Sequence, residues 1–252
     1  MSLAPITSDA LPGICHGFFT RAGGASSGIF AGLNCGYGSS DQTEAVALNR
    51  ARVAQALGAD PSAMMALHQV HSAKAVTIDA PFDGTPPRAD ALVTAVPGLV
   101  LTVLTADCQP VLFADPQAGV VAAAHAGWRG TLDGVLEATI EAMAALGARP
   151  AATVAIVGPT ISQRNYEVGE DFLETFRAED PDSLRFFANG KGDRFLFDLP
   201  GFGLHRLRAA GIGHAEWCGH CTYGDPERFF SYRRSVHAGE VDYGRLISAI
   251  RL

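Results

Sequence analysis

Two short apolar runs constrain the fold of this chain more than any other feature. They cover residues 99–106 and 119–124, are rich in Val, Leu and Ala, and are bounded by turn residues. Runs of this length and composition favour buried strands over helices. Asp107 and Cys108 follow the first run, and His125 follows the second. The two strand ends therefore predict a cleft that contains a thiol and an imidazole.

Composition narrows the class of protein. With 252 residues, of which 48% are hydrophobic, the chain has ample material for a large core, and we expect a single domain over residues 1–252. The formal net charge of −7 argues against a general affinity for nucleic acid or for an anionic membrane surface. A small soluble molecule is the expected partner.

The N-terminal residues and the cysteines predict a cellular compartment. The chain does not start with a basic segment followed by an apolar run, and its longest uncharged apolar stretch, residues 91–106, is short and contains Pro97. Five cysteines, an odd number scattered along the chain, do not resemble a disulfide framework. We therefore expect a cytoplasmic protein with reduced thiols and no membrane contact.

Strands and helices are expected to alternate along the chain. A capping pattern at Asp41 and Glu44 begins a helix over 42–57, and Gly58 ends it. A strand is expected over 73–78, a surface loop over 79–89, and one helix from the residues behind His125 to Gly147. The further predicted elements are strands at 153–157 and 195–199, helices at 170–178 and 204–210, a strand, loop and strand over 214–234, and a closing strand over 243–252.

The strongest candidates for metal binding or catalysis are His71, Cys108 and His125. One thiolate and two imidazoles with a fourth position left open form a known type of catalytic zinc shell. The same residues also suit a cysteine hydrolase in which His125 deprotonates Cys108. Asp107 would orient a histidine, act as a general base, or cap a turn. Chemistry alone leaves these alternatives open.

Anion and ligand contacts are predicted at three further places. The strand end at His125 followed by a helix start is a natural anion site, which Arg129 would strengthen. In the glycine-rich segment 13–40, Arg21, Ser26 and Asn34 either line a ligand pocket or belong to a turn-rich β segment. Arg50 lies on the predicted helix 42–57, where it either contacts a ligand or belongs to a solvated face.

Two further patterns bear on metal chemistry. Cys218, His220 and Cys221 resemble half of a zinc site, but no second CxxC or HxxxH pair completes it. Multicopper oxidases need many histidines, generally in HxH pairs. The eight histidines of this chain include no such pair, which argues against oxidation of phenols.

Four ordered motifs resemble the laccase-domain or YfiH-like family, whose members are variously named polyphenol oxidase, peptidoglycan editing factor and purine nucleoside phosphorylase. The motifs are QVHS at 69–72, TADCQPVLFAD at 105–115, AAAHAGWRG at 122–130 and CTYGDPERFFSYRR at 221–234. The similarity extends from about Gly17 to the end of the chain. The segment after FFSYRR is longer than in many relatives.

The resemblance implies both fold and function. It implies an α+β fold, a mixed α/β sandwich whose mixed sheets are flanked by helices, with the site at one edge. It also implies metal ligands at His71, Cys108 and His125, with zinc as the metal and copper as its competitor. The implied activity is phosphorolysis of adenosine, inosine, guanosine and methylthioadenosine, with deamination of adenosine as a second activity.

These activities assign roles to residues. Asp107 and Cys108 would be the catalytic pair, with Asp107 as a proton shuttle for deamination. Asn34, Arg50 and Arg129 would bind the substrates, the arginines by pairing with phosphate. The alternatives are a cysteine hydrolase or peptidoglycan editing factor that uses Cys108 and His125, and a copper-binding polyphenol oxidase.

Overall fold

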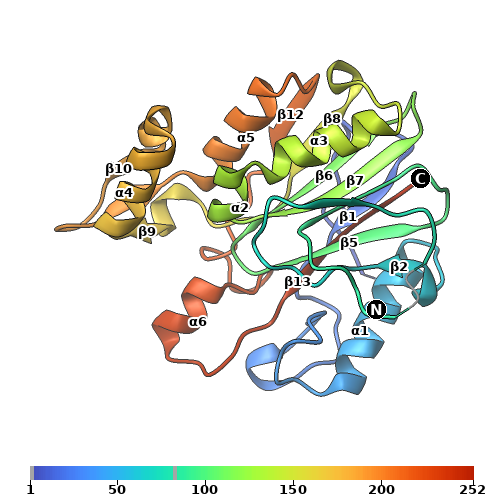
Figure 1. The fold of residues 1–252 in the computed structure, drawn as a ribbon. Coiled ribbons are helices and arrows are strands. Elements are labelled where there is room, and N and C mark those ends of the chain that lie inside the picture. The colour runs from blue at the N-terminus through green and yellow to red at the C-terminus, as the bar shows by residue number, and fades with distance from the viewer. Residues whose placement is uncertain (1–2, 82–83) are drawn as a thin grey trace.

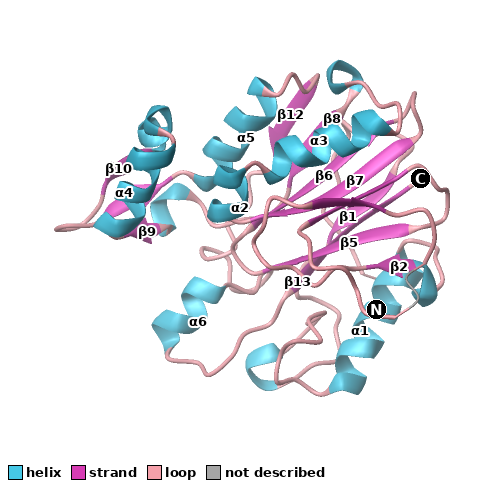
Figure 2. Cartoon of the chain, in the orientation of Figure 1, coloured by secondary structure: helices cyan, strands magenta, loops and turns pink. Residues whose placement is uncertain are grey.

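Two packed β-sheets form the centre of the protein in the computed structural model, which describes residues 3–81 and 84–252 (Figures 1 and 2). In spatial order, the larger sheet contains β12 (His214–Trp217), β8 (Val154–Val157), β6 (Gln109–Asp115), β7 (Val120–Ala126), β4 (Ala91–Thr94) and β3 (Ala75–Thr77). The smaller sheet contains β1 (Cys15–Phe18), β13 (Leu246–Arg251), β5 (Val100–Thr105) and β2 (Met64–Met65). Both sheets are mixed, because β12–β8, β3–β4 and β2–β5 pair in parallel and the other neighbours pair antiparallel.

Helices cover the outer faces of both sheets. Apolar residues of α3 (Val135–Ala145) and α5 (Leu199–Ala209) pack on the larger sheet, and those of α1 (Thr43–Ala56) pack on the smaller one. A separate cluster of buried residues fills the space between the sheets. The layers are therefore helix, sheet, sheet, helix, as the predicted α+β sandwich requires (Figure 1).

A small group of strands and a helix extend the sandwich at one end (Figure 1). A third sheet contains β10 (Phe187–Asn189), β11 (Phe195–Phe197) and β9 (Glu167–Val168), and α4 (Glu170–Glu179) packs with it through aromatic residues. The last two helices are α2 (Trp128–Asp133) and α6 (Tyr232–Ala238). Short 3₁₀ turns occur at Gly28–Phe30, Pro61–Ala63, Pro150–Ala152, Gln163–Asn165 and Pro181–Phe186.

The two apolar runs are strands, as predicted. In β7, Val120 and Ala122 face the helices, whereas Val121 and Ala123 face the smaller sheet. Because both faces of the strand are covered, the sequence is continuously apolar instead of alternating. Strand β6, which was not predicted, lies beside β7 and carries the same double-sided pattern.

Two predicted elements are wrong in detail. The helix behind His125 is divided into α2 and α3 by Gly134, whose φ of 100° is a left-handed conformation that interrupts a helix. The end of segment 214–234 was predicted as a strand, but α6 begins at Tyr232. The Ser231 hydroxyl accepts a hydrogen bond from the Arg234 N–H, and Gly239 ends the helix with a φ of 68°.

Other boundaries differ less. The predicted helix 204–210 begins earlier, at Leu199, because the Asp198 side chain caps its first turn by accepting from the Gly201 N–H. Of the predicted loop 79–89, Phe82 and Asp83 lie outside the described residues. In the described part of the chain, no helix is both long and apolar enough to span a bilayer. The single-domain organisation over 1–252 stays a prediction.

Candidate functional site

The structure brings the side chains of His71, Cys108 and His125 together. Their potential ligand atoms all lie within 4.8 Å of one another, and the described residues contain no other group of three or more such donors. His71 precedes β3, Cys108 lies in the turn between β5 and β6, and His125 lies on β7. The site therefore depends on the packing of the two sheets.

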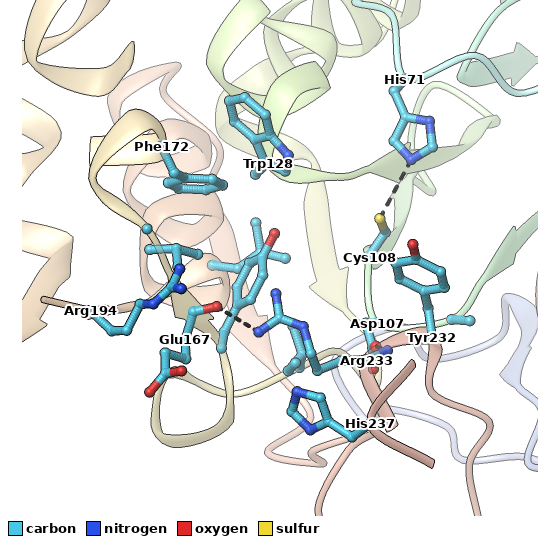
Figure 3. A pocket seen from close by; sticks show the side chains of 16 residues that line it. His71, Asp107, Cys108, Trp128, Glu167, Phe172, Arg194, Tyr232, Arg233 and His237 are labelled. Carbon is cyan, nitrogen blue, oxygen red and sulfur yellow. Dashed lines mark hydrogen bonds between the residues drawn. The ribbon is translucent and has the colours of Figure 1, made fainter. Parts of the chain in front are cut away.

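The spacing of these donors suits a tetrahedral metal ion. Bonds of about 2.3 Å from zinc to sulfur and about 2.0–2.1 Å from zinc to nitrogen, at a tetrahedral angle, place the sulfur and nitrogen about 3.6 Å apart. The distance from Cys108 Sγ to His71 Nε2 is 3.8 Å (Figure 3). The donor set thus fits zinc, and its softness also suits copper.

Asp90 holds both histidines in place. Its carboxylate accepts hydrogen bonds from the backbone N–H groups of His71 and Ser72, at 3.0 and 2.7 Å, and lies 2.8 Å from His125 Nδ1. The contact with Nδ1 directs Nε2 of His125 toward the cluster, which is a common arrangement behind metal-binding histidines. His71 has a φ of 60°, an unfavourable conformation that these hydrogen bonds help to hold.

The electrostatics of the cluster favour a thiolate. Burial of Cys108 acts to raise its pKa, but the charges and hydrogen bonds of His125 and His71 outweigh burial and lower the pKa to about 6. Burial likewise acts to lower the pKa of His125, whereas Cys108 and Asp90 raise it to about 9. Thiolate is the form of cysteine that binds metals and acts as a nucleophile.

Asp107 is buried behind Cys108 and is engaged by neutral donors. Its Oδ1 accepts from the Thr222 hydroxyl at 2.6 Å, and its Oδ2 accepts from the Ser231 hydroxyl at 2.9 Å and the Arg233 N–H at 2.7 Å. Burial raises the pKa of this carboxyl even though the hydrogen bonds oppose the shift. Asp107 therefore anchors the start of α6 beside the cluster.

Two cavities flank the cluster and share His71, Ala106, Cys108 and Tyr232. The larger cavity has a volume of about 610 Å³. Its lining includes Asp107, the aromatic side chains of Trp128, Tyr166 and Phe172, and the arginines Arg194 and Arg233. The smaller, of about 580 Å³, is bounded by the segment 67–69, residues near Leu104, and Arg245. A ligand in either cavity would lie against Cys108.

Aromatic side chains form one wall of the larger cavity. Trp128 and Phe172 lie side by side (Figure 3), with ring centroids 4.5 Å apart, and the ring centroid of Tyr166 lies 6.0 Å from that of Phe172. Arg233 extends from α6 into the same cavity, with Glu167 on one side and Cys108 on the other (Figure 3). The cavity thus combines an apolar surface with a cationic group.

The predicted substrate-binding residues Asn34 and Arg50 line neither cavity. Asn34 is fully buried. Its amide donates to Ser39 and Asp41, and its oxygen accepts from the Arg245 N–H. Arg50 donates to the Cys35 carbonyl. Both side chains hold loops together in this structure.

The structure also places Arg129 outside both cavities. Its two terminal nitrogens donate to the Glu179 carboxylate at 2.9 Å, and the guanidinium also pairs with Asp133. Arg129, which was predicted to contact an anion at this helix start, therefore has the carboxylates of Glu179 and Asp133 as its partners in this structure. Arg21 and Ser26 likewise line neither of these cavities: Arg21 donates to the carbonyls of Ala31 and Pro226, and Ser26 accepts from the Asn49 amide.

The weak cluster Cys218, His220 and Cys221 does not form a metal site of three or more donors. Instead, Cys221 Sγ accepts hydrogen bonds from the Ser162 hydroxyl and the Asn165 amide.

Sequence reasoning missed Asp90, the aromatic wall and Arg233. Arg233 lies within the motif FFSYRR, which supports the family resemblance, but the sequence assigned no function to this arginine. Asp90 and Phe172 gave none, because only the fold brings them to the cluster or the cavity.

Comparison with known proteins links this geometry to a family. The family model described as "Multi-copper polyphenol oxidoreductase laccase" matches residues 15–252. A relative from Deinococcus radiodurans, named purine nucleoside phosphorylase, is 45% identical over 94% of this chain and 88% of its own length. A relative of the same name from Pseudomonas aeruginosa is 39% identical over 87% of this chain and 88% of its own length.

Solved structures show the same fold. A Neisseria meningitidis protein of the DUF152 family has a TM-score of 0.89 and 36% identity, with 100% of this chain and 99% of that chain covered. YlmD from Geobacillus stearothermophilus has a TM-score of 0.90 and 28% identity, with 100% and 96% covered.

Proposed function

Because the chain belongs to the family described as multi-copper polyphenol oxidoreductase laccase, we propose that it is a cytoplasmic purine nucleoside phosphorylase that also deaminates adenosine. Its proposed substrates are adenosine, inosine, guanosine and methylthioadenosine, together with inorganic phosphate. The observation that supports this most is that one cavity joins the metal-ligand cluster to an aromatic wall and an arginine. The names of the relatives support the phosphorylase part of this proposal.

The aromatic wall suits a purine base. The rings of Trp128 and Phe172, which are tilted by 46° to each other, offer apolar faces beside the cluster. Stacking a base on an aromatic side chain stabilises binding by about 1–3 kcal/mol. A cavity of about 610 Å³ is within the usual range for sites that bind small molecules.

Phosphorolysis requires a phosphate oxygen to form a bond to C1 of the ribose as the bond from C1 to the purine nitrogen breaks. The purine leaves with the electron pair and takes up a proton, and the products are the free base and ribose 1-phosphate. Positive charge develops on the ribose, so the anionic phosphate must be held close to it. The cationic group in the cavity supplies an attractive contact for that phosphate.

Deamination adds water to C6 of adenine and releases ammonia, which converts adenosine into inosine. His71, Cys108 and His125 would hold zinc, with copper as its competitor, and a bound metal would supply a Lewis acid that activates water. The predicted proton-transfer role of Asp107 stays a prediction, although Asp107 and Cys108 both line the cavity.

Chromatography of the products tests this function. Incubation with adenosine should give adenine and ribose 1-phosphate only when phosphate is present, and inosine with or without phosphate. Inosine, guanosine and methylthioadenosine should each lose their base only with phosphate. Failure to convert any of these nucleosides, in protein shown to contain its metal, would contradict the proposal.

A cysteine hydrolase is the second candidate, because two histidines stabilise the Cys108 thiolate. That enzyme would keep its activity after removal of metal and lose it after alkylation of the thiol. A metal-dependent phosphorylase should lose activity when a chelator removes the metal and regain it when zinc is restored.

A further inference from the structure

We propose that Arg233 binds the phosphate group of the ligand in the larger cavity. This inference rests on the proposed function, because it identifies the group that holds the phosphate of that reaction. The ligand chemistry is a phosphate group. Its source is either inorganic phosphate, as a co-substrate, or the 5′-phosphate of a purine nucleotide.

Arg233 differs from the other arginines of the two cavities in its charge partners. The lining arginines are Arg194, Arg233 and Arg245. Arg245 lies 3.4 Å from Asp242, and Arg194 lies 3.6 Å from Asp193. Within residues 3–81 and 84–252, Arg233 forms no salt bridge. An anionic ligand is therefore the natural partner for its charge.

The guanidinium of Arg233 is held in a defined place. Its Nη1 donates to the Glu167 carbonyl at 2.5 Å, and its central carbon lies 5.3 Å from the centre of the Tyr166 ring. Its Nε and Nη2 have no acceptor among the described residues. A planar guanidinium with two unused donors can bind a phosphate through two parallel hydrogen bonds, which a lysine cannot do.

The backbone fixes Arg233 relative to the metal-ligand cluster. The Arg233 N–H donates to Asp107, the residue next to Cys108 in the chain. The backbone of Arg233 is thus held by the side chain of the residue that directly precedes Cys108. A phosphate on Arg233 would lie in the cavity that also contains His71, Cys108 and the aromatic wall (Figure 3), so phosphate and nucleoside would meet there.

Equilibrium dialysis against radiolabelled inorganic phosphate and against adenosine 5′-monophosphate tests this assignment. The purified, metal-containing protein is compared with Arg233→Ala and Arg233→Lys. Loss of one bidentate contact should weaken binding about 10- to 100-fold in Arg233→Ala. Arg233→Lys, which keeps the charge, should bind with intermediate affinity.

Arg52→Ala is the matched control, because Arg52 also donates one hydrogen bond to a backbone carbonyl, that of Gly23, and lies outside both cavities. It should bind both ligands as the unmodified protein does. Because the substitutions at Arg233 leave its backbone N–H in place, the contact with Asp107 should persist, and a thermal melt checks that the variants are folded.

The binding results distinguish the two sources of the phosphate group and test the assignment itself. Weaker binding of inorganic phosphate in Arg233→Ala supports the assignment with phosphate as co-substrate, and a loss confined to the nucleotide supports it with the 5′-phosphate as the group bound. Unchanged binding of both ligands, or an equal loss in Arg52→Ala, would overturn it. If Arg233→Ala loses phosphate while the unmodified protein converts no nucleoside, the proposed function fails and the phosphate site stands.

Discussion

Asp90 Oδ1 lies 2.8 Å from His125 Nδ1, and both side chains are buried between the ends of β4 and β7. Burial acts to raise the pKa of Asp90, but hydrogen bonds from His125 and Ser72 outweigh burial and hold the pKa at about 2. The carboxylate therefore stays ionised and orients the imidazole.

Replacing this carboxylate should weaken metal binding. In Asp90→Asn, the amide cannot accept from His125, His71 and Ser72 as the carboxylate does, and the zinc affinity should fall about 10- to 100-fold. Competition with a chromophoric chelator measures the affinity. Asp193→Asn is the control, since the Asp193 side chain is 93% exposed. Equal affinities in the two variants would contradict the positioning role of Asp90.

Elemental analysis should find about one zinc ion per chain. Cys108→Ser and His71→Ala each remove one of three donors and should lose most of the metal. Cys218→Ser, which changes a thiol outside the cluster, should keep it. Folded Cys108→Ser protein that retains stoichiometric zinc would show that the ligand set is wrong.

The thiol of Cys108 should react at a lower pH than the other cysteines. Its pKa of about 6 means that the thiolate predominates above that pH, whereas burial raises the pKa of Cys35 to about 12. In metal-free protein, alkylation by iodoacetamide, followed by mass spectrometry, should reach half of its maximal rate near pH 6 at Cys108. Bound metal should protect this residue, and equal rates with and without metal would exclude Cys108 as a ligand.

Asp107→Asn should destabilise the fold. The carboxylate accepts three hydrogen bonds, from the Thr222 and Ser231 hydroxyls and the Arg233 N–H. An amide accepts only through its oxygen, so at least one of these buried donors would lose its acceptor. A buried donor left without a partner costs about 1–3 kcal/mol of unfolding free energy, which urea denaturation measures. If Asp107 transfers a proton, adenosine deamination should fall far more than phosphorolysis. Equal losses would support a positioning role alone.

Gly127 allows the cluster to close. A Cβ at this position would lie 3.0 Å from Cys108 Sγ and 3.0 Å from His71 Cδ2. Gly127→Ala should therefore displace a ligand and reduce zinc content. At Gly224, the nearest atoms would be 3.4 Å away, so Gly224→Ala should bind zinc normally. Equal metal contents, measured by mass spectrometry of the metal, would contradict this steric constraint.

The sequence predicted the elements whose patterns are local. The strands β5 and β7, which are covered on both faces, and the helices α1 and α4 each lie close to their predicted ranges. The predicted cap at Asp41 was wrong, because α1 begins after Gln42 without a side-chain cap and Asp41 instead accepts from the Gln42 N–H and the Asn34 amide. The division at Gly134 and the helix α6 depend on single residues that set backbone conformation or cap a turn. Such signals are weak beside the periodicity of their neighbours.

The candidate site likewise contains some residues that the sequence predicts and others that only the fold brings into place. His71, Cys108 and His125 carry recognisable donor chemistry, and the fold brings them together. Arg129 has the right charge, but its two carboxylate partners include Glu179, which is distant in sequence. No spacing rule predicts that pairing. Arg233 gains its place through the tertiary contact of its backbone with Asp107.

Because β13 lies between β1 and β5, the smaller sheet can be completed only after residues 246–251 have been synthesised. Residues 15–18 leave the ribosome early, yet their neighbouring strand comprises residues 246–251. The larger sheet uses residues 75–217 and can form before that strand emerges. The apolar face of the larger sheet that packs against the smaller sheet then stays exposed until the smaller sheet is complete. During translation, the nascent chain should therefore present this face to chaperones until the final strand has been made.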